Sequence, residues 1–475
     1  MLDLVARSWE RDVLPSLTEY ISIPSLSPMF EPRWAELGHI DDAVEHVKAW
    51  CAGREIDGLD VSVHRLDGRT PVLVVEVPAT GGTGATDPAD TVLLYGHLDK
   101  QPPMEGWLEG LGPFSPVRRG DLLYGRGGGD DGYAAYAALT AIEAVQRSGG
   151  THARCVVVIE ASEESGSPDL PAHVDALGDR IGEPSLVVCL DSGCATFDRL
   201  WVTTSLRGLA GLNVTVRVLD EGVHSGSAGG VVPSSFRLLR QLLDRIEDAG
   251  SGELLVPEVH AAIPPDRAEE LAATAAELGM AVAGAFPLVE GLDLQPGDDP
   301  AAILRARTWE PSLAYVGADG IPAGELAGNV LRAYTTLKLS FRLPPTADSQ
   351  RAAEAVKAVL EADPPASAEV HAEVEDVGPG WNAPAFTPWL RDALDEASKA
   401  TFGLPARTIG EGGSIPFMGM LGERFPDAQF VVTGVLGPGS NAHGPNEFLH
   451  IPCATSVTAA VGHLLTAHAA RARAA

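Results

Sequence analysis

Three apolar runs, each followed by side chains that bind metals, most constrain how this 475-residue chain folds. The runs cover residues 91–96, 154–161 and 185–190, and a helix-like stretch at 132–147 separates the first two. Runs that are apolar on both faces and alternate with helices indicate a mostly parallel sheet covered by helices. Ligands of such sheets bind beyond the carboxyl ends of the strands. We therefore expect an α/β domain whose chemistry lies at one edge of a central sheet.

The side chains that follow these runs are candidates for a metal centre. The first run ends in His97 and Asp99, the second precedes Glu163 and Glu164, and the third precedes Asp191. An imidazole at a strand end is a natural ligand, and an aspartate two residues on can accept its other N–H. Of two adjacent glutamates, one can bind a cation and the other can act as general base. The ordinary alternatives are a solvated helix start for the glutamates and a helix N-cap for Asp191.

Two glycine-containing loops add an aspartate and a histidine to this set. The loop 125–132 reads GRGGGDDG and carries Asp130, and the loop 437–447 reads GPGSNAHGPNE and carries His443. The first loop lacks the GK[ST] ending of a phosphate-binding loop, which disfavours nucleotide binding. Oxygen and nitrogen ligands without thiolates suit two divalent metals in a hydrolytic site. The sequence contains neither HExxH nor G-x-S-x-G, which disfavours a single-zinc helix motif and a serine hydrolase.

The pattern of the chain changes near residue 208. Residues 212–220 and 337–343 alternate between apolar and polar side chains, which is typical of an antiparallel sheet with one wet face. We therefore expect an inserted α+β domain at 208–385, and a discontinuous catalytic domain formed by 1–207 and 386–475. The expected helices lie at 1–24, 41–52, 233–248, 266–280, 349–362, 387–401 and 452–472. Further strands are expected at 72–77 and 429–435, a surface loop at 78–90, and a glycine-rich turn at 410–414.

Composition excludes several classes of function. The chain has 34 Lys and Arg against 65 Asp and Glu, a net charge of −31 that makes nucleic acid and anionic membranes poor partners. No apolar stretch reaches the roughly 18 residues of a membrane-spanning helix, and the charged start MLDLVARSWERD does not resemble a secretory signal. The five cysteines are scattered without a CxxC pair, which favours buried thiols over disulfides. We expect a cytoplasmic protein.

Taken together and in order, eight motifs resemble those of the M20 metallopeptidases, and specifically their dipeptidase branch related to carnosine dipeptidase. They are GHLDKQPP, GRGGGDD, EESGS, the strand end at Asp191, HSG, FRLPP, EGGSIP and NAHGPNE. The resemblance covers about residues 90–450. It implies a phosphorylase/hydrolase-like catalytic domain, two divalent metal ions per subunit and an inserted lid domain that forms a homodimer. Zinc is the ion expected first, with manganese or cobalt as alternatives.

The resemblance also assigns roles at the metal centre. One ion is held by His97 and Asp191, the other by Glu164 and His443, and Asp130 bridges both. In the same assignment Glu163 is the general base that takes a proton from water and later delivers it to the leaving amine. Asp99 is the partner that orients the imidazole of His97.

Five further residues are assigned to substrate binding by the same resemblance. His224 is an oxyanion donor that comes from the partner subunit in related dimeric enzymes. Arg342 clamps the C-terminal carboxylate of the substrate, since a planar guanidinium pairs well with a carboxylate. Asn329 and the backbone around Gly413 and Ser414 assist it. As ordinary alternatives, His224 and Ser414 are turn residues and Arg342 lies on the wet face of a strand.

The chain departs from the family pattern at two places. The second motif continues as Asp130-Asp131-Gly132-Tyr133, without the lysine that the family often has, and Arg332 stands where the family often has proline. The implied reaction is hydrolysis of a dipeptide or short peptide with a free C-terminal carboxylate. The near alternative is an N-acyl amino acid deacylase or a desuccinylase of the same fold. The alternative from another class is a catalytically silent peptide-binding protein.

Overall fold

The computed structural model of the chain describes residues 1–80, 90–284, 286, 288–413 and 415–471. The chain divides into two compact units. Unit 1 comprises Met1–Thr204, Ala383–Ile409 and Met420–Ala475, and unit 2 comprises Ser205–Asn382 and Gly410–Gly419. The segment 410–419 thus groups with unit 2, whereas the sequence-based division placed it in the catalytic domain. Most of the surface loop expected at 78–90, and Ser414, lie outside the described residues.

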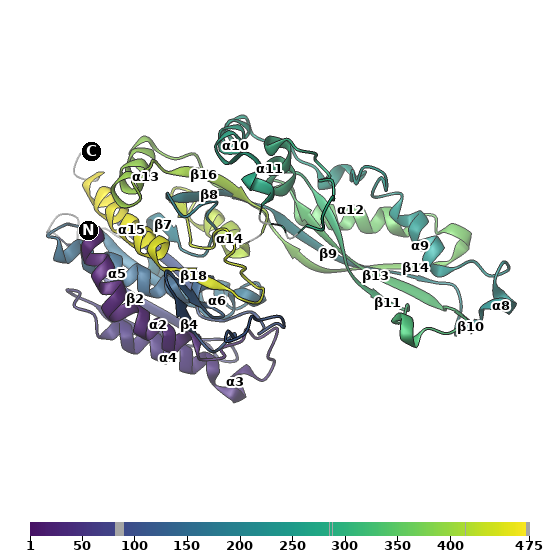
Figure 1. Cartoon of the computed structure of the whole chain (residues 1–475), viewed down its shortest axis with the longest axis horizontal. Coiled ribbons are helices and arrows are strands. Elements are labelled where there is room, and N and C mark those ends of the chain that lie inside the picture. Colours follow the sequence, from purple (N-terminus) through teal and green to yellow (C-terminus); the bar gives the residue numbers. More distant parts are fainter. Residues whose placement is uncertain (81–89, 285, 287, 414, 472–475) are drawn as a thin grey trace. The chain divides into compact units, whose positions relative to one another are not determined.

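A large mixed sheet has the strand order β1-β2-β6-β3-β7-β17-β8-β15, and β16 also pairs with β8 (Figure 1). Most of it belongs to unit 1, while β15 and the last residues of β8 and β16 fall in unit 2. The strands of the sheet are β1 (Asp60–His64), β2 (Val72–Val77), β3 (Thr91–His97), β6 (Arg154–Glu160), β7 (Pro184–Cys189), β8 (Trp201–Leu206), β15 (Trp381–Asn382), β16 (Arg407–Glu411) and β17 (Gln429–Val432). A separate three-stranded sheet contains β4 (Val117–Arg119), β5 (Leu122–Tyr124) and β18 (Phe448–His450).

The centre of the large sheet is parallel and its margins are antiparallel. Strand β3 pairs in parallel with β6 on one side and with β7 on the other, and β7 pairs in parallel with β17. In contrast, β2 runs antiparallel to both β1 and β6, and β8 runs antiparallel to β17. The central strands are almost completely buried, as expected for strands covered on both faces. Apolar runs alone therefore located the strands, while the direction of β2 depends on its connections.

The helices of unit 1 pack against this sheet and against one another. They are α1 (Leu2–Ser8), α2 (Leu14–Ile21), α3 (Trp34–Leu37), α4 (His39–Ala52), α5 (Tyr133–Arg147), α6 (Leu170–Ala176), α7 (Gly178–Ile181), α13 (Pro388–Thr401), α14 (Pro416–Arg424) and α15 (Ile451–Arg471). Helix α5 is alanine-rich and buried nearly all round, because it packs between β3 and α15. It ends where Gly149 adopts φ +72° and the N–H of Gly150 bonds the Val145 carbonyl at 2.9 Å.

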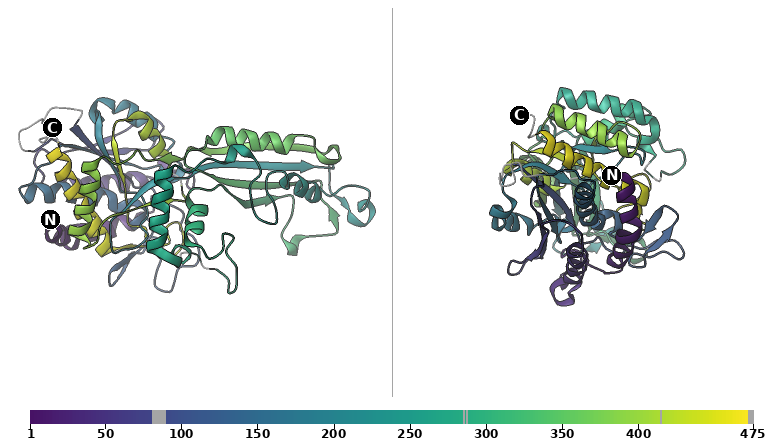
Figure 2. Two further views of the ribbon diagram at one scale, coloured as in Figure 1. Left: turned by 90° about the horizontal axis from the view of Figure 1, so that it is seen from above. Right: turned by 90° about the vertical axis from the view of Figure 1, so that its left-hand side faces the viewer.

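Unit 2 is an antiparallel four-stranded sheet in the order β11-β13-β9-β14, covered on one face by helices (Figure 2). Its elements are β9 (Gly208–Arg217), β10 (Val223–His224), α8 (Ser225–Ala228), α9 (Ser235–Leu243), α10 (Pro265–Leu278), α11 (Pro300–Thr308), β11 (Ser312–Asp319), β12 (Val330–Leu331), β13 (Tyr334–Leu343), α12 (Ser349–Glu361) and β14 (Glu369–Gly378). The alternating apolar side chains of β9 and β13 form a core with α9 and α12. Strand β9 begins at Gly208, before the alternating stretch that starts at residue 212.

The cysteines and the helices also bear on two expectations from composition. All five cysteines are free and buried, as the scattered pattern predicted. Within the described part of the chain, no helix combines the length and apolar character needed to cross a membrane.

Candidate metal centre

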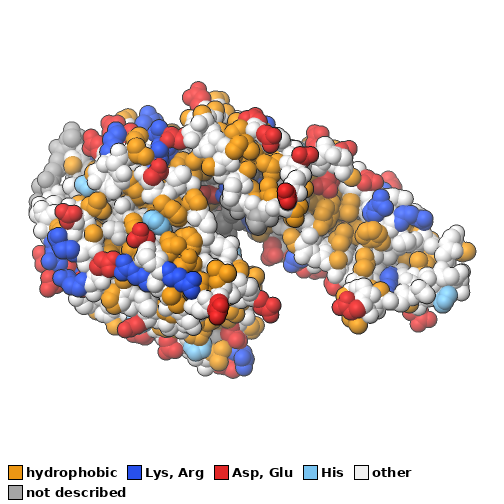
Figure 3. Space-filling view, viewed as in Figure 1, with side chains coloured by type: hydrophobic (Ala, Val, Ile, Leu, Met, Phe, Trp, Pro, Cys, Tyr) orange, Lys and Arg blue, Asp and Glu red, His pale blue; other side chains and the backbone are white. Residues whose placement is uncertain are grey.

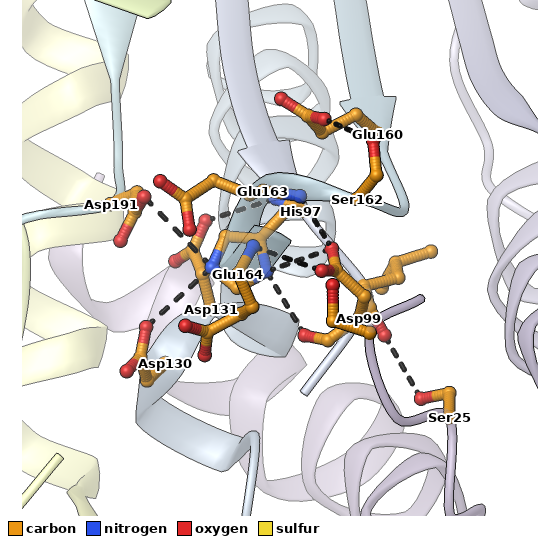
Figure 4. A network of polar contacts seen from close by, with 12 residues as sticks. Ser25, His97, Asp99, Asp130, Asp131, Glu160, Ser162, Glu163, Glu164 and Asp191 are labelled. Carbon is orange, nitrogen blue, oxygen red and sulfur yellow. Dashed lines mark hydrogen bonds and ion pairs between the residues drawn. The ribbon is translucent and has the colours of Figure 1, made fainter. Parts of the chain in front are cut away.

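The predicted metal-binding side chains converge at the carboxyl ends of adjacent strands of unit 1 (Figure 4). His97 is the last residue of β3, Glu163 and Glu164 form the turn after β6, and Asp191 follows β7. Because β6, β3 and β7 are neighbours, these side chains meet at one edge of the sheet. Close packing defines this edge: a Cβ on Gly96 would lie 2.4 Å from the Cβ of Ala134. The strand therefore requires glycine immediately before its histidine.

Two ligand clusters share one aspartate. The first contains His97, Asp130 and Asp191, and the second contains Asp130, Glu164 and His443, with the ligand atoms of each cluster within 4.8 Å of one another. His97 Nε2 lies 3.5 Å from Asp130 Oδ1 and 3.9 Å from Asp191 Oδ2. His443 Nε2 lies 3.1 Å from Asp130 Oδ2 and 3.4 Å from Glu164 Oε2. The two carboxylate oxygens of Asp130 thus face different clusters.

The donor set fits divalent cations. Among the described residues, His97 Nε2 and Glu164 Oε1 are buried atoms without a hydrogen-bond partner. Buried polar atoms normally have partners, and both atoms belong to cluster residues, whose lone pairs a cation would accept. Imidazole nitrogens and carboxylate oxygens in this combination are common ligands of zinc and manganese. The residues present therefore fit two metal ions that share Asp130.

Electrostatics at the centre favour a positive ligand. Burial and the charges of neighbouring groups raise the pKa of Asp191 to about 6. Burial also raises the pKa of Glu163 and of Glu164, and nearby carboxylates add to the effect. Burial acts in the same direction on Asp130, but the adjacent imidazoles of His443 and His97 outweigh it and lower the pKa of Asp130. Carboxylates crowded into a buried site repel one another, so bound cations would stabilise their charged forms.

Asp99 lies beside His97, as its predicted role requires, and it also contacts the glutamate turn. The N–H groups of Glu163 and Glu164 donate to its two carboxylate oxygens, each at 3.0 Å. His97 Nδ1 lies 3.1 Å from the main-chain carbonyl of Asp99 and 3.5 Å from its carboxylate. The backbone carbonyl is therefore the closer acceptor for the imidazole N–H. The Asp99 carboxylate, 3.5 Å from the imidazole, also holds the turn that carries the two glutamates.

Several polar residues at the centre were missed by sequence reasoning. Gln101 Nε2 donates to Glu164 Oε2 at 2.6 Å. Glu160 is buried behind the Glu163 turn, and it accepts hydrogen bonds from Tyr95 at 2.7 Å and Ser167 at 2.8 Å. Their position could have revealed them: Gln101 lies within the first motif and Glu160 lies near the end of the second apolar run, and neither side chain had been given a role.

The predicted substrate residues belong to unit 2, with Ser414 outside the described residues. His224 ends β10, where its Nδ1 accepts the N–H of Gly226 at 3.1 Å. The carbonyl of Asn329 accepts the N–H of Ser225 at 2.9 Å, so Asn329 and His224 lie close together. Arg342 lies near the opposite end of β13, half-buried and opposite Leu209 of β9. Gly413 is exposed.

Arg342 is one member of a positive group within unit 2. Burial, together with the charges of Arg342 and Arg307, lowers the pKa of Arg207 to about 10. The guanidinium of Arg207 donates to the carbonyl of Gly412 at 3.2 Å and to Ser312 Oγ at 3.2 Å. Clustered arginines of this kind suit an anionic ligand. Neither Arg207 nor Arg307 was singled out from the sequence.

Comparison with protein-family models gives two matches. Residues 93–225 match the model described as peptidase family M20/M25/M40, and residues 204–368 match the peptidase dimerisation domain. The second match lies almost entirely within the sheet and helices of unit 2.

Similar proteins cover nearly the whole chain. A cysteinylglycine-S-conjugate dipeptidase of Corynebacterium striatum is 30% identical over 450 residues, which are 92% of this chain and 90% of that protein. The solved structure of the dipeptidase Dug1p from Saccharomyces cerevisiae has a TM-score of 0.78 at 23% identity, with 99% of each chain covered. Human carnosine dipeptidase 1 has a TM-score of 0.74 at 23% identity, with 99% of this chain and 100% of that chain covered.

Proposed function

The chain belongs to the M20 peptidase family, and we propose that it cleaves dipeptides or other short peptides with a free C-terminal carboxylate. It is a metal-dependent peptide hydrolase, and its relatives include dipeptidases named for Cys-Gly substrates and for carnosine. The observation that carries the proposal is the pair of ligand clusters that share Asp130 beside Glu163. The dipeptidase names of the relatives favour this substrate class over N-acyl amino acids.

The metal centre is proposed to hold two ions. His97 and Asp191 would bind one ion, Glu164 and His443 would bind the other, and Asp130 would bridge them. Zinc is the proposed ion, with manganese and cobalt as alternatives, because the donor set accepts all three. When bound, such ions polarise a carbonyl oxygen and lower the pKa of a water molecule.

Glu163 is proposed to move the proton. It follows β6 next to the ligand Glu164, and its backbone is held by the Asp99 carboxylate. A carboxylate in this place can take a proton from the attacking water and pass it to the departing amine nitrogen. The buried surroundings keep bulk water from competing for that proton.

The substrate carboxylate is proposed to bind at Arg342. A guanidinium donates two parallel hydrogen bonds to a carboxylate, and the neighbouring Arg207 and Arg307 add positive charge. The backbone of Gly413 is in the same unit and is proposed to assist, as is Ser414. Such a site explains a requirement for a free C-terminus.

The distance between His224 and Arg342 within unit 2 supports a homodimer. His224 pairs with Val330, beyond the Tyr334 end of β13, while Arg342 lies eight residues further along that strand (Figure 1). At about 3.3 Å per residue the two ends are roughly 26 Å apart. An extended dipeptide spans only about 7 Å, so His224 and Arg342 of one chain cannot both contact it. His224 and Asn329 are therefore proposed to serve the site of the partner subunit, where His224 stabilises the oxyanion.

Unit 2 also offers a surface for this dimer. Strand β11 pairs only with β13 among the described strands, so one of its edges is open. Large apolar side chains are exposed on β11 and nearby: Tyr315, Val316, Leu326, Val330 and Tyr334. The space-filling view shows hydrophobic side chains over the strands of this unit (Figure 3). An open edge beside apolar side chains is a template for pairing with a second copy.

A cytoplasmic location is proposed as well, because the free buried thiols suit a reducing compartment.

The test combines metal analysis with a cleavage panel. The chelated protein is reloaded with zinc, manganese or cobalt and offered dipeptides, amidated dipeptides and N-acyl amino acids. We expect two ions per chain and cleavage of the free dipeptides alone. Glu163→Gln should lower kcat by about 100-fold or more, as for loss of a general base, with two ions still bound. Preferred cleavage of N-acyl amino acids would contradict the dipeptidase proposal, and full activity of Glu163→Gln would contradict the base assignment.

A further inference from the structure

A buried ion pair that no assigned role uses lies next to the metal centre. Arg126 belongs to the glycine-rich loop that carries Asp130, and Glu447 is the last residue of the loop that carries His443. Arg126 Nη1 donates to Glu447 Oε2, and their side chains are 1% and 0% exposed. Buried charges in proteins are almost always paired, and this pair joins segments 321 residues apart in sequence.

The pair fastens three loops that carry metal-centre residues. Glu447 Oε1 accepts the N–H of Gly127 at 2.9 Å, which fixes the start of the loop leading to Asp130. Arg126 Nη2 donates to the carbonyl of Gly444 at 2.9 Å, directly after His443. Arg126 Nε donates to the carbonyl of Pro102 at 3.2 Å, in the loop that follows His97. Both side chains thus bond backbone groups in the loops that carry or follow the ligands.

The pair adds to a small set of contacts between the loop of Asp130 and the loop of His443. His443 adopts a positive φ of 64°, and its side chain is 57% exposed, so packing alone does not orient it. The short pairing of β5 with β18 ends at Tyr124 and Phe448, and the N–H of Gly125 to the carbonyl of Glu447 extends it by one bond of 3.0 Å. Arg126 and Glu447 then supply buried side-chain hydrogen bonds between the loops, in addition to the contact of His443 Nε2 with Asp130 Oδ2 at 3.1 Å.

General stability is a weak reason for such a pair. Buried ion pairs are often replaceable by apolar side chains of similar size without loss of stability, because desolvation offsets their attraction. A role in setting the spacing of groups is better supported for buried polar residues. The chain contains a comparison pair: Arg54 Nε donates to Glu143 Oε2 at 2.8 Å, with side chains 9% and 5% exposed. That pair has no ligand next to it in sequence.

We propose that Arg126 and Glu447 are positioning residues that hold Asp130 and His443 at the spacing a metal ion needs. The inference rests on the proposed metal centre and deepens it. It predicts that the ion bound by Asp130, Glu164 and His443 depends on the pair more than the ion bound through His97 and Asp191. Partners that orient ligands typically contribute 10- to 100-fold in metal affinity.

The test measures the affinity of each ion in the full-length protein. Zinc is titrated in competition with a chromophoric chelator, and cobalt spectra report the ligand geometry. The variant Arg126→Met/Glu447→Met removes both charges together and leaves no unpaired buried charge. The control Arg54→Met/Glu143→Met makes the same exchange away from the centre. Arg126→Lys is a milder variant, because lysine keeps the charge and loses the fork that reaches Glu447, Gly444 and Pro102.

We expect wild type and the control to bind two ions each, and the control to bind each ion with the wild-type affinity. The Arg126→Met/Glu447→Met variant should bind one ion normally and the other 10- to 100-fold more weakly, with a changed cobalt spectrum. Arg126→Lys should show the same selective loss to a smaller extent, and it decides the matter if the double variant does not fold. Wild-type affinity for both ions in the variants, or an equal loss in the control, would overturn the proposal. A wild-type protein that binds fewer than two ions would instead refute the proposed metal centre itself.

Discussion

Glu160 should make the stability of this protein fall as the pH rises through neutrality. Its carboxylate is 1% exposed and accepts hydrogen bonds from Tyr95, Ser162 and Ser167 behind the turn that carries the catalytic candidates. Burial raises the pKa of Glu160 from 4.5 to about 7, and the charge of Asp99 adds to the effect. The substitution Glu160→Gln keeps the shape of the side chain and removes its titration.

The sign follows from where the proton is held more tightly. The folded pKa of Glu160 lies above the unfolded value, so the folded state binds more protons than the unfolded state between pH 4.5 and about 7. Its contribution to stability is therefore fully present below the unfolded pKa and is lost as the pH rises through that window. Between pH 5 and pH 8 the calculated loss is about 2.5 kcal/mol. Above pH 8 the contribution stays constant.

The assay is urea unfolding of the metal-free protein at several pH values from 5 to 8, followed by circular dichroism. The free energy of unfolding of Glu160→Gln minus that of wild type should rise by about 2.5 kcal/mol across this range. Taking the difference cancels groups that titrate alike in both proteins. Tyr95→Phe is the matched variant: it removes a hydrogen bond that lowers the pKa of Glu160, so the pH dependence should become steeper. A difference between Glu160→Gln and wild type that stays flat from pH 5 to 8 would refute the reasoning.

Two further predictions test the dimer and the strand end. Mixing His224→Ala with Glu163→Gln under conditions that exchange subunits should restore about a quarter of wild-type activity, because half the dimers then hold one intact site; no recovery after verified exchange would contradict a shared site. Gly96→Ala should cost about 1–3 kcal/mol of stability and weaken metal binding, because its Cβ would lie 2.4 Å from that of Ala134. Gly324→Ala, which meets no atom within 4 Å, is the control and should unfold like wild type; equal effects of the two substitutions would argue against the steric account.

The apolar runs predicted the central strands well because those strands are buried on both faces. A strand in that environment needs apolar side chains at nearly every position. The strands β3, β6 and β7 can therefore be recognised from their own sequence, without knowing which strands they pair with. Strand β2 looks the same in sequence, yet it runs antiparallel to β6. Strand direction depends on how the connections cross the sheet, which a local pattern does not record.

Some features of the metal centre follow from the local sequence, and others depend on the tertiary structure. The sequence by itself determined which side chains stand at strand ends and what chemistry they can support, since residue type and strand position are local properties. Only the tertiary structure decided that Asp99 holds the glutamate turn, and that Glu447 meets Arg126 across 321 residues. It also separated His224, in the two-stranded pairing of β10 with β12, from Arg342 near the far end of β13. These are contacts between distant segments, and the packing of the whole chain sets them.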